Sequence, residues 1–151
     1  MPRIGVLSDT HGMLRREVAE LLQGCDQIIH GGDFASAEIL EALESIAPVH
    51  AVRGNNDWGG WAAHLPRQLV FDIEGVRFCM ALDRNWLPRN LQGVQVVVFG
   101  HSHQYYEERI DGRLWLNPGS CGYPRFRREL SMAVLTVDGG AVEVRRVDIQ
   151  P

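Results

Sequence analysis

The sequence is poor in cysteine, has no excess of basic residues and contains no long apolar run. Its three cysteines (Cys25, Cys79 and Cys121) are widely spaced and form no CxxC pair, so we expect neither a disulfide framework nor a structural zinc site. No apolar run approaches the ~18 residues that a membrane helix needs, and the first residues enter a strand without a basic and then apolar leader. We therefore expect a cytoplasmic protein with no membrane partner.

The charge balance excludes some classes of partner. The formal net charge is −4, which gives no electrostatic basis for binding bulk nucleic acid or a membrane surface. A local cluster of Arg125, Arg127 and Arg128 could still hold an anion. With 151 residues, 45% of them hydrophobic, the chain can bury a core as one domain over residues 1–151. We expect a small-molecule partner, and the sequence leaves open whether the chain forms a homo-oligomer.

Strand and helix patterns alternate in the first half of the chain. Short apolar segments predict strands at residues 3–7, 27–30 and 49–52. Apolar residues spaced i, i+4, i+7, i+8 and i+11 from Leu14 predict a helix that starts near Met13 and ends near Gly24. A second helix is expected between an N-cap at Ser36 and Pro48. Strands joined by helices in this way are parallel neighbours in one sheet.

The second half of the chain is expected to be mostly antiparallel. Apolar and alternating segments predict strands at residues 68–73, 76–81, 94–99, 105–110, 113–117, 132–137 and 142–147. Hairpin turns are indicated by Glu74-Gly75, by Asp111-Gly112 and by residues 138–140. The whole chain is therefore expected to have an α/β fold.

Polar side chains with metal-binding chemistry follow four of these strands. They are Asp9, His11, Asp33, Asn55, His101 and His103. Taken singly, each could be a helix cap, a turn residue or a satisfied polar group. Together they form a set of carboxylate, imidazole and amide groups without thiolate, which suits Mn²⁺, Fe²⁺ or Zn²⁺. A carboxylate such as Asp33 can bridge two ions, and two ions ~3.5–4 Å apart are suited to phosphate ester hydrolysis.

Five ordered motifs carry a resemblance to a known family. They are Ser8-Asp9-Thr10-His11, Gly32-Asp33, Gly54-Asn55-Asn56-Asp57, Gly100-His101-Ser102-His103 and Asn117-Pro118-Gly119-Ser120. In this order they resemble the calcineurin-like metallophosphoesterases, and most of all the small bacterial and archaeal phosphodiesterases whose group includes the retromer subunit Vps29. The resemblance implies a four-layer α/β/β/α sandwich with mixed sheets and a centre of one or two divalent ions. Mn²⁺ is the first expectation, with Zn²⁺, Fe²⁺ or Ni²⁺ as alternatives.

The resemblance also implies a role for individual residues. Asp9, His11, Asp33 and His103 would hold the first ion, whereas Asp33, Asn55 and His101 would contribute to the second. The segment 117–120 would form a structural turn beside the site, with Gly119 present for its backbone conformation.

The chain departs from the family pattern after residue 81. Leu82 stands where a metal-binding histidine is expected, and Leu82 cannot bind a metal. Asp83 could replace that ligand after a small shift of the loop. Arg84 would repel a second ion or neutralise the phosphate. Asn56 stands where many relatives have a histidine, and its amide can orient a substrate but cannot act as a general acid. We therefore treat Asn56 and Arg84 as the candidate catalytic residues.

Three functions agree with this pattern. The first is a phosphodiesterase or phosphatase that hydrolyses a small phosphate ester through metal-activated hydroxide. The second is a metal-binding protein with little catalytic power, and the third is a Vps29-like binding or scaffold protein. Trp58, Trp61 and Trp86 could form a docking patch or grip an aromatic substrate. His30 is expected to hydrogen-bond near the ligands, and His64 is expected to face solvent.

Overall fold

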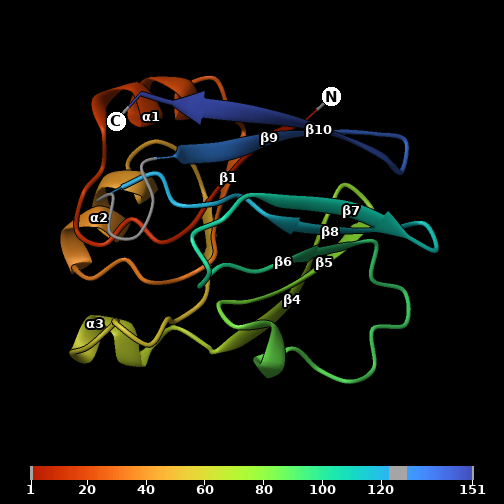
Figure 1. The fold of residues 1–151 in the computed structure, drawn as a ribbon, viewed down its shortest axis with the longest axis horizontal. Helices are drawn as coiled ribbons and strands as arrows, with labels where there is room; N and C mark the ends of the chain where they lie inside the picture. The colour runs from red at the N-terminus through yellow and green to blue at the C-terminus, as the bar shows by residue number, and fades with distance from the viewer. Residues whose placement is uncertain (1, 123–128, 151) are drawn as a thin grey trace.

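A computed structural model describes residues 2–122 and 129–150 of the chain (Figure 1). The elements in order are β1 (Arg3–Leu7), α1 (Arg16–Leu22), β2 (Gln27–His30), α2 (Ala37–Glu44), β3 (Val49–Ala51), α3 (Gly60–Ala63), β4 (Gln68–Ile73), β5 (Val76–Ala81), the 3-10 helix η1 (Arg84–Trp86), β6 (Val96–Val98), β7 (Tyr106–Ile110), β8 (Arg113–Asn117), β9 (Leu130–Asp138) and β10 (Ala141–Ile149).

The first sheet has the strand order β10-β9-β1-β2-β3. β1 is parallel to β2, and β2 is parallel to β3, so the prediction of consecutive parallel strands is confirmed. β9 then pairs antiparallel with β1, and β10 with β9. The last hairpin of the chain therefore extends the sheet that the first strands begin.

The second sheet has the strand order β4-β5-β6-β8-β7. The hairpins β4–β5 and β7–β8 are antiparallel, as predicted. The prediction of mostly antiparallel structure is wrong at the centre of this sheet, because β5 and β6 are parallel and so are β6 and β8. Long connections separate these strands in the sequence, and local residue patterns do not specify the direction of such pairs.

Three clusters of buried apolar residues lie between the layers of helices and sheets or against their outer face. One lies between the two sheets and includes Ile4 and Val6 of β1, with Val96 and Val98 of β6. A second lies between the first sheet and helices α1 and α2. The third covers the outer face of the second sheet, where Val97 packs with apolar residues of the 3-10 helix region and its loop. The α/β/β/α fold class is confirmed, although η1 and the following loop form a thin fourth layer.

Several helix boundaries differ from the prediction. α1 begins at Arg16 because Arg15, which precedes it, has an extended backbone with ψ 146°. Ser36 is the N-cap of α2 as predicted, but its side chain makes no capping hydrogen bond. α3 lies between the predicted strands at residues 49–52 and 68–73, where no helix was predicted. Among the residues described, no helix has the length and apolar character needed to cross a membrane.

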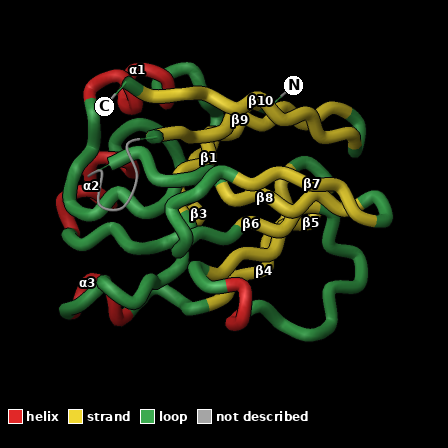
Figure 2. Tube along the Cα trace, in the orientation of Figure 1, coloured by secondary structure: helices red, strands yellow, loops and turns green. Residues whose placement is uncertain are grey.

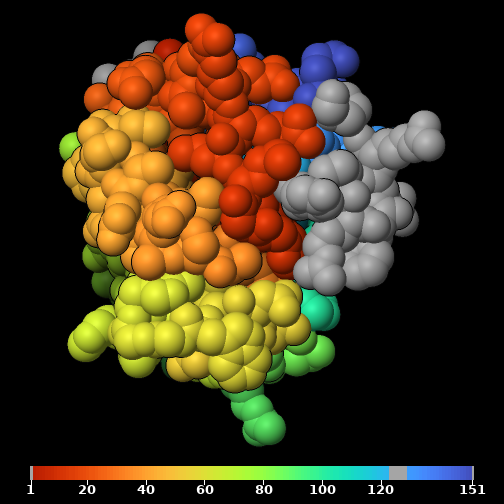
Figure 3. Space-filling view, turned by 90° about the vertical axis from the view of Figure 1, so that its left-hand side faces the viewer, coloured from red at the N-terminus to blue at the C-terminus, as the bar shows by residue number. Residues whose placement is uncertain are grey.

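The carboxyl ends of strands from both sheets meet at one edge of the molecule, which we call the rim. Figure 2 shows the loops of this edge in green at the left, where strands of both sheets end. Figure 3 faces the same side, and the segments coloured red, orange and yellow lie next to one another on it. The fold therefore brings the loops after β1, β2 and β3 together, as the parallel strand order predicts.

Candidate metal centre

Backbone hydrogen bonds fix the loops of the rim to one another. The Asp9 N–H donates to the carbonyl of Gly32 at 2.9 Å, and the His11 N–H donates to the carbonyl of Asp33 at 3.0 Å. On the side of the second sheet, the Gly100 N–H donates to the carbonyl of Leu82 at 2.8 Å. Main-chain hydrogen bonds thus join the loops after β1 and β2 to each other, and likewise the loops after β5 and β6.

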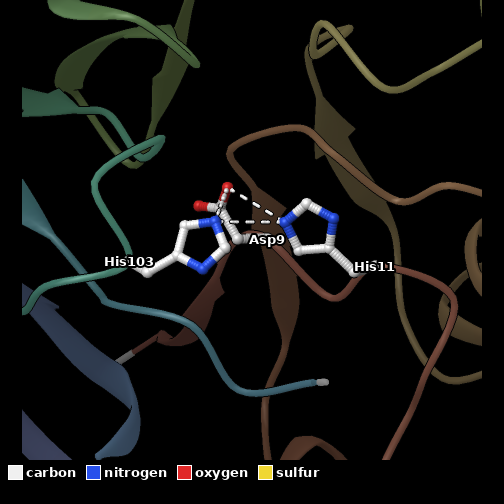
Figure 4. Close-up of side chains that lie close together, drawn as sticks. All are labelled: Asp9, His11 and His103. Atoms are coloured by element: carbon white, nitrogen blue, oxygen red, sulfur yellow. Dashed lines mark hydrogen bonds and ion pairs between the residues drawn. The ribbon is translucent and has the colours of Figure 1, made fainter. Parts of the chain in front are cut away.

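Asp9, His11 and His103 converge on one point of the rim (Figure 4). The two Nε2 atoms of the histidines lie 3.1 Å apart. Oδ1 of Asp9 lies 3.4 Å from Nε2 of His103 and 3.7 Å from Nε2 of His11. Within the described residues, these three form the group of acidic and histidine side chains whose possible ligand atoms all lie within 4.8 Å of one another.

The spacing of these three atoms fits a metal ion. Ligand atoms about 2.1 Å from a tetrahedral ion lie ~3.4 Å apart, which is close to the three observed distances. Oδ1 of Asp9 is also the buried side-chain atom that has no hydrogen-bond partner within the described residues. An unsatisfied buried carboxylate oxygen is costly, and an ion at this point would satisfy it. The donor set of one carboxylate and two imidazoles suits Mn²⁺, Fe²⁺ or Zn²⁺.

The electrostatics of Asp9 keep this ligand ionised. Burial alone would raise the pKa of Asp9, but the neighbouring rings of His103 and His11 and the hydroxyl of Ser8 outweigh it. The pKa of Asp9 therefore lies well below its ordinary value. The Ser8 hydroxyl donates to Oδ2 at 2.8 Å, and so does the His101 N–H at 3.2 Å. Oδ2 is thus held by the protein, whereas Oδ1 points at the two histidines.

Asp33, Asn55 and Asn56 form a second polar group on the rim. The Asn56 N–H donates to Oδ1 of Asp33 at 2.9 Å, and the Asn56 amide donates to Oδ2 at 3.3 Å. The exposed amide of Asn55 has one terminal atom 3.0 Å from both carboxylate oxygens. If that atom is the amide nitrogen, it donates hydrogen bonds to Asp33. If it is the amide oxygen, it and the Asp33 carboxylate would together present oxygen ligands to a hard cation.

Burial raises the pKa of Asp33, and the Asn56 N–H partly offsets this effect. The negative charge of Asp9 raises the pKa further. The charge of Asp9 therefore opposes the ionisation of Asp33 at the rim. A cation between these groups would relieve this repulsion. The structure brings Asp33 and Asn55 together as a pair, outside the cluster of three, and their role as ligands stays a prediction.

Asp57 holds the two loops that carry these residues, a role that its sequence context does not indicate. Its side chain is buried and accepts three backbone N–H groups, from Asp33 at 3.0 Å, Gly54 at 2.8 Å and Ala35 at 2.9 Å. A turn motif such as Asn-Asn-Asp gives no local signal for such long-range contacts. Asp57 fixes Asp33 in place through the main chain.

The remaining predicted ligands lie outside the cluster of three. The side chain of His101 is exposed. Leu82 is fully buried and lies close to both Gly32 and Gly100. Oδ1 of Asp83 accepts the N–H of Asn85 at 2.9 Å and caps η1. The proposed replacement of the missing histidine by Asp83 therefore requires that this capping bond break.

The arginines predicted near the site fall into two groups. The guanidinium of Arg84 lies over the rings of Phe99, Tyr106 and Trp115. Arg125, Arg127 and Arg128 lie outside the described residues. The expected role of Arg84 in neutralising phosphate stays a prediction, and its described contacts are with aromatic rings.

Backbone strain marks the predicted ligands. Asp9, His11, Asp33, His101 and His103 all have positive φ, between 49° and 75°. This left-handed region costs an ordinary residue on the order of 1–3 kcal/mol, and such strain gathers at functional sites. Residue patterns do not predict these dihedral angles.

Two glycines allow the loops to approach the carboxylates. A Cβ on Gly54 would lie 2.1 Å from Oδ1 of Asp33, and one on Gly100 would lie 2.6 Å from Oδ2 of Asp9. Gly119 has φ +79°, in agreement with the conformational role expected for it. A hydrogen bond from the Ser120 hydroxyl to the carbonyl of Asp9, at 2.9 Å, joins the 117–120 turn to the site.

His30 is a buried neighbour of the centre. Its Nε2 lies 3.0 Å from the Thr10 hydroxyl, and its Nδ1 accepts the Gly32 N–H at 3.0 Å. Because Nδ1 accepts, the proton of the neutral ring is on Nε2. Burial lowers the pKa of His30 from 6.5 to about 3. The expected hydrogen-bonding role of His30 is observed, while His64 is exposed as predicted.

We expect His30 to make stability depend on pH. The folded pKa of about 3 lies below the unfolded value of 6.5, so the unfolded chain binds the proton between these values and stability falls as pH decreases. At pH 5 the loss is about 2 kcal/mol. Urea unfolding of the metal-free protein at pH 7.5 and pH 5 measures this loss of unfolding free energy. His30→Gln should remove the contribution of His30 to the loss. The matched change at the exposed His64, His64→Gln, should retain it, and equal pH dependence of the two variants would contradict the prediction.

Comparison with known proteins places the chain in one family. Residues 2–140 match the model of the calcineurin-like phosphoesterase superfamily domain. A protein of Methanothermobacter thermautotrophicus named "Probable metallophosphoesterase" is 33% identical over 150 residues, covering 90% of this chain and 86% of the relative. The chain therefore belongs to the calcineurin-like phosphoesterase superfamily, as the resemblance implied.

Two solved structures have the same fold. One is described as a novel archaeal phosphodiesterase and has a TM-score of 0.80 and 23% identity, over 97% of this chain and 99% of that chain. The other is Vps29 of Chaetomium thermophilum, with a TM-score of 0.78 and 19% identity, over 99% of this chain and 97% of that chain. At these identities, the likeness establishes the fold.

Proposed function

We propose that this protein is a metal-dependent phosphodiesterase that acts on a small phosphate ester. The observation that carries the proposal is the convergence of Asp9, His11 and His103, with Oδ1 of Asp9 buried and, among the described residues, without a hydrogen-bond partner. Membership of the phosphoesterase superfamily supports the reaction class. A divalent ion held by these three side chains supplies a Lewis acid for phosphate oxygens and a means of ionising water at neutral pH.

The residues around the three ligands have separate tasks in this proposal. Asp33 and Asn55 are the pair that would help to hold a second ion beside the first. The Asn56 amide lies 3.3 Å from Oδ2 of Asp33 and could turn to orient a phosphate oxygen. His101 projects from the same rim and is accessible to the substrate or to a second ion. None of these tasks requires a thiolate, and all three cysteines are buried and free.

The experiment that tests this proposal combines metal analysis with turnover. The purified protein should contain at least one equivalent of a transition metal and should hydrolyse bis(p-nitrophenyl) phosphate faster when Mn²⁺ is added. Other divalent ions, namely Zn²⁺, Fe²⁺ and Ni²⁺, are compared in the same assay. If neither stoichiometric metal nor metal-dependent turnover is found, the enzymatic function is wrong.

A Vps29-like binding role is the second candidate. Trp58 is 72% exposed and directly follows Asp57 in the loop of the rim. A large exposed aromatic side chain of this kind is typical of a docking surface as well as of a substrate site. Retention of fold without metal or turnover in the experiment above would favour this candidate.

We expect Leu82→His to strengthen the second metal position. Leu82 is fully buried beside Gly32 and Gly100, which directly precede Asp33 and His101. An imidazole at residue 82 should raise metal content from about one equivalent toward two and increase diester hydrolysis by roughly tenfold. Leu82→Gln is the matched control, since it introduces a polar side chain of similar size without an imidazole. Unchanged metal content in Leu82→His would mean that the loop has been rebuilt around Asp83 or Arg84.

A further inference from the structure

A pocket of about 450 Å³ lies next to the metal centre. Its walls come from residues 83–85, and from residues 99–102 and 104–106 on the chain that follows β6. Pockets that bind small organic molecules have volumes of about 300–1,000 Å³. The pocket is therefore large enough for an organic group attached to a phosphate.

One segment joins this pocket to the centre. The His101 N–H donates to Oδ2 of Asp9, and the same residue lines the pocket with Gly100. His103, which belongs to the cluster of three, follows two residues later. A phosphodiester with its phosphorus at the metal centre would therefore have one of its two substituents beside the pocket.

Aromatic rings hold Arg84 at the wall of the pocket. The guanidinium carbon of Arg84 lies 4.8 Å from the ring centroid of Phe99, 5.2 Å from that of Trp115 and 5.8 Å from that of Tyr106. Phe99 and Tyr106 line the same pocket. A guanidinium group positioned in this way offers a flat surface on which a base can stack, and hydrogen-bond donors at its edge.

The charges and polar groups of the pocket favour a neutral heteroaromatic group over a second anion. Asp83 and Arg84 carry opposite charges, so their fields oppose each other. Asn85, Ser102 and Gln104 add amide and hydroxyl groups, which both donate and accept hydrogen bonds. A nucleobase presents an aromatic face and a mixed edge of donors and acceptors, which matches this lining.

We propose that this pocket selects the second substituent of the phosphodiester, that it takes a nucleoside, and that Arg84 is the specificity-determining residue. The proposal rests on the phosphodiesterase function proposed above. It assigns to Arg84 a role different from neutralising the phosphate, because a residue acting on the phosphate would serve all diesters alike.

Two substrates with the same leaving group test this role. They are thymidine 5′-(p-nitrophenyl) phosphate and methyl p-nitrophenyl phosphate, which have equal charge and differ in the second substituent. The Mn²⁺-loaded protein should prefer the thymidine ester at least tenfold in kcat/KM. Arg84→Met should reduce this preference by about tenfold, mainly by raising KM for the thymidine ester. Arg89→Met changes an exposed arginine outside the pocket lining and should leave the preference unchanged.

Direct binding separates this proposal from the proposed function. Thymidine added to the metal-free protein should shift the amide resonances of Phe99, Ser102 and Tyr106 in NMR spectra, and Arg84→Met should abolish these shifts. An equal loss of activity on both esters in Arg84→Met, or no preference in the unchanged protein, would overturn the proposal. If neither ester is hydrolysed, the proposed phosphodiesterase function is wrong. If thymidine also fails to shift these amide resonances, the pocket is not a nucleoside site either.

Discussion

Replacing His103 with alanine is expected to remove bound metal and to lower phosphodiester hydrolysis at least about 100-fold. The Nε2 atom of His103 lies 3.1 Å from Nε2 of His11 and 3.4 Å from Oδ1 of Asp9. Its loss would leave two of the three converging donors, too few to hold a divalent ion firmly. Metal content by atomic emission and initial rates with added Mn²⁺ measure the two effects.

The control for this prediction is His64→Ala. His64 is exposed in the segment after α3, so its replacement should change neither metal content nor rate. Circular dichroism of both variants tests whether the fold is retained. Unchanged metal content in His103→Ala would show that the assignment of ligands is wrong, whatever the effect on the rate.

The second large effect is expected from Asp57→Ala, which should lower the free energy of unfolding by about 3–5 kcal/mol. The change would leave the N–H groups of Asp33, Ala35 and Gly54 without their acceptor. The Asp33 and Gly54 donors are buried, and each buried donor left unpaired costs on the order of 1–3 kcal/mol, whereas the N–H of the exposed Ala35 can turn to water. Urea unfolding of the metal-free protein measures the loss.

Asp83→Ala is the matched control for Asp57→Ala. The Asp83 carboxylate also accepts a backbone N–H, that of Asn85, but it does so at the partly exposed cap of η1. Its removal should cost no more than about 1 kcal/mol, because water can replace the lost acceptor. If the two variants lost equal stability, Asp57 would not be the residue that holds the rim together.

Much of the fold could be predicted because its signals are local. The bounds of β1, β2, β4, β5 and β8 agree with the predicted strands. These strands are short apolar or alternating segments that end at turn residues. Adjacent residues in the sequence therefore indicate where each strand begins and ends. The parallel pairing of β5 with β6 was missed, since it depends on contacts between segments far apart in the sequence.

The site could be predicted in part. Asp9, His11 and His103 come together, and their residue types and positions after strands were the signals that indicated a metal centre. The contact between Asp57 and the loop after β2 was not predictable, because an aspartate in a polar turn has the same local pattern whether or not it has distant partners. The position of Arg84 over three rings likewise depends on the packing of the second sheet.

The left-handed backbone of the rim has a consequence for laboratory evolution. Asp9, His11, Asp33, His101 and His103 occupy backbone conformations that glycine adopts without strain. At His101, whose side chain is exposed, a selection for thermal stability alone would therefore favour glycine, and the accepted change would delete a predicted ligand. We expect heat-selected variants to lose this side chain while they keep the fold, so a screen for robust forms of this protein has to select for metal content at the same time.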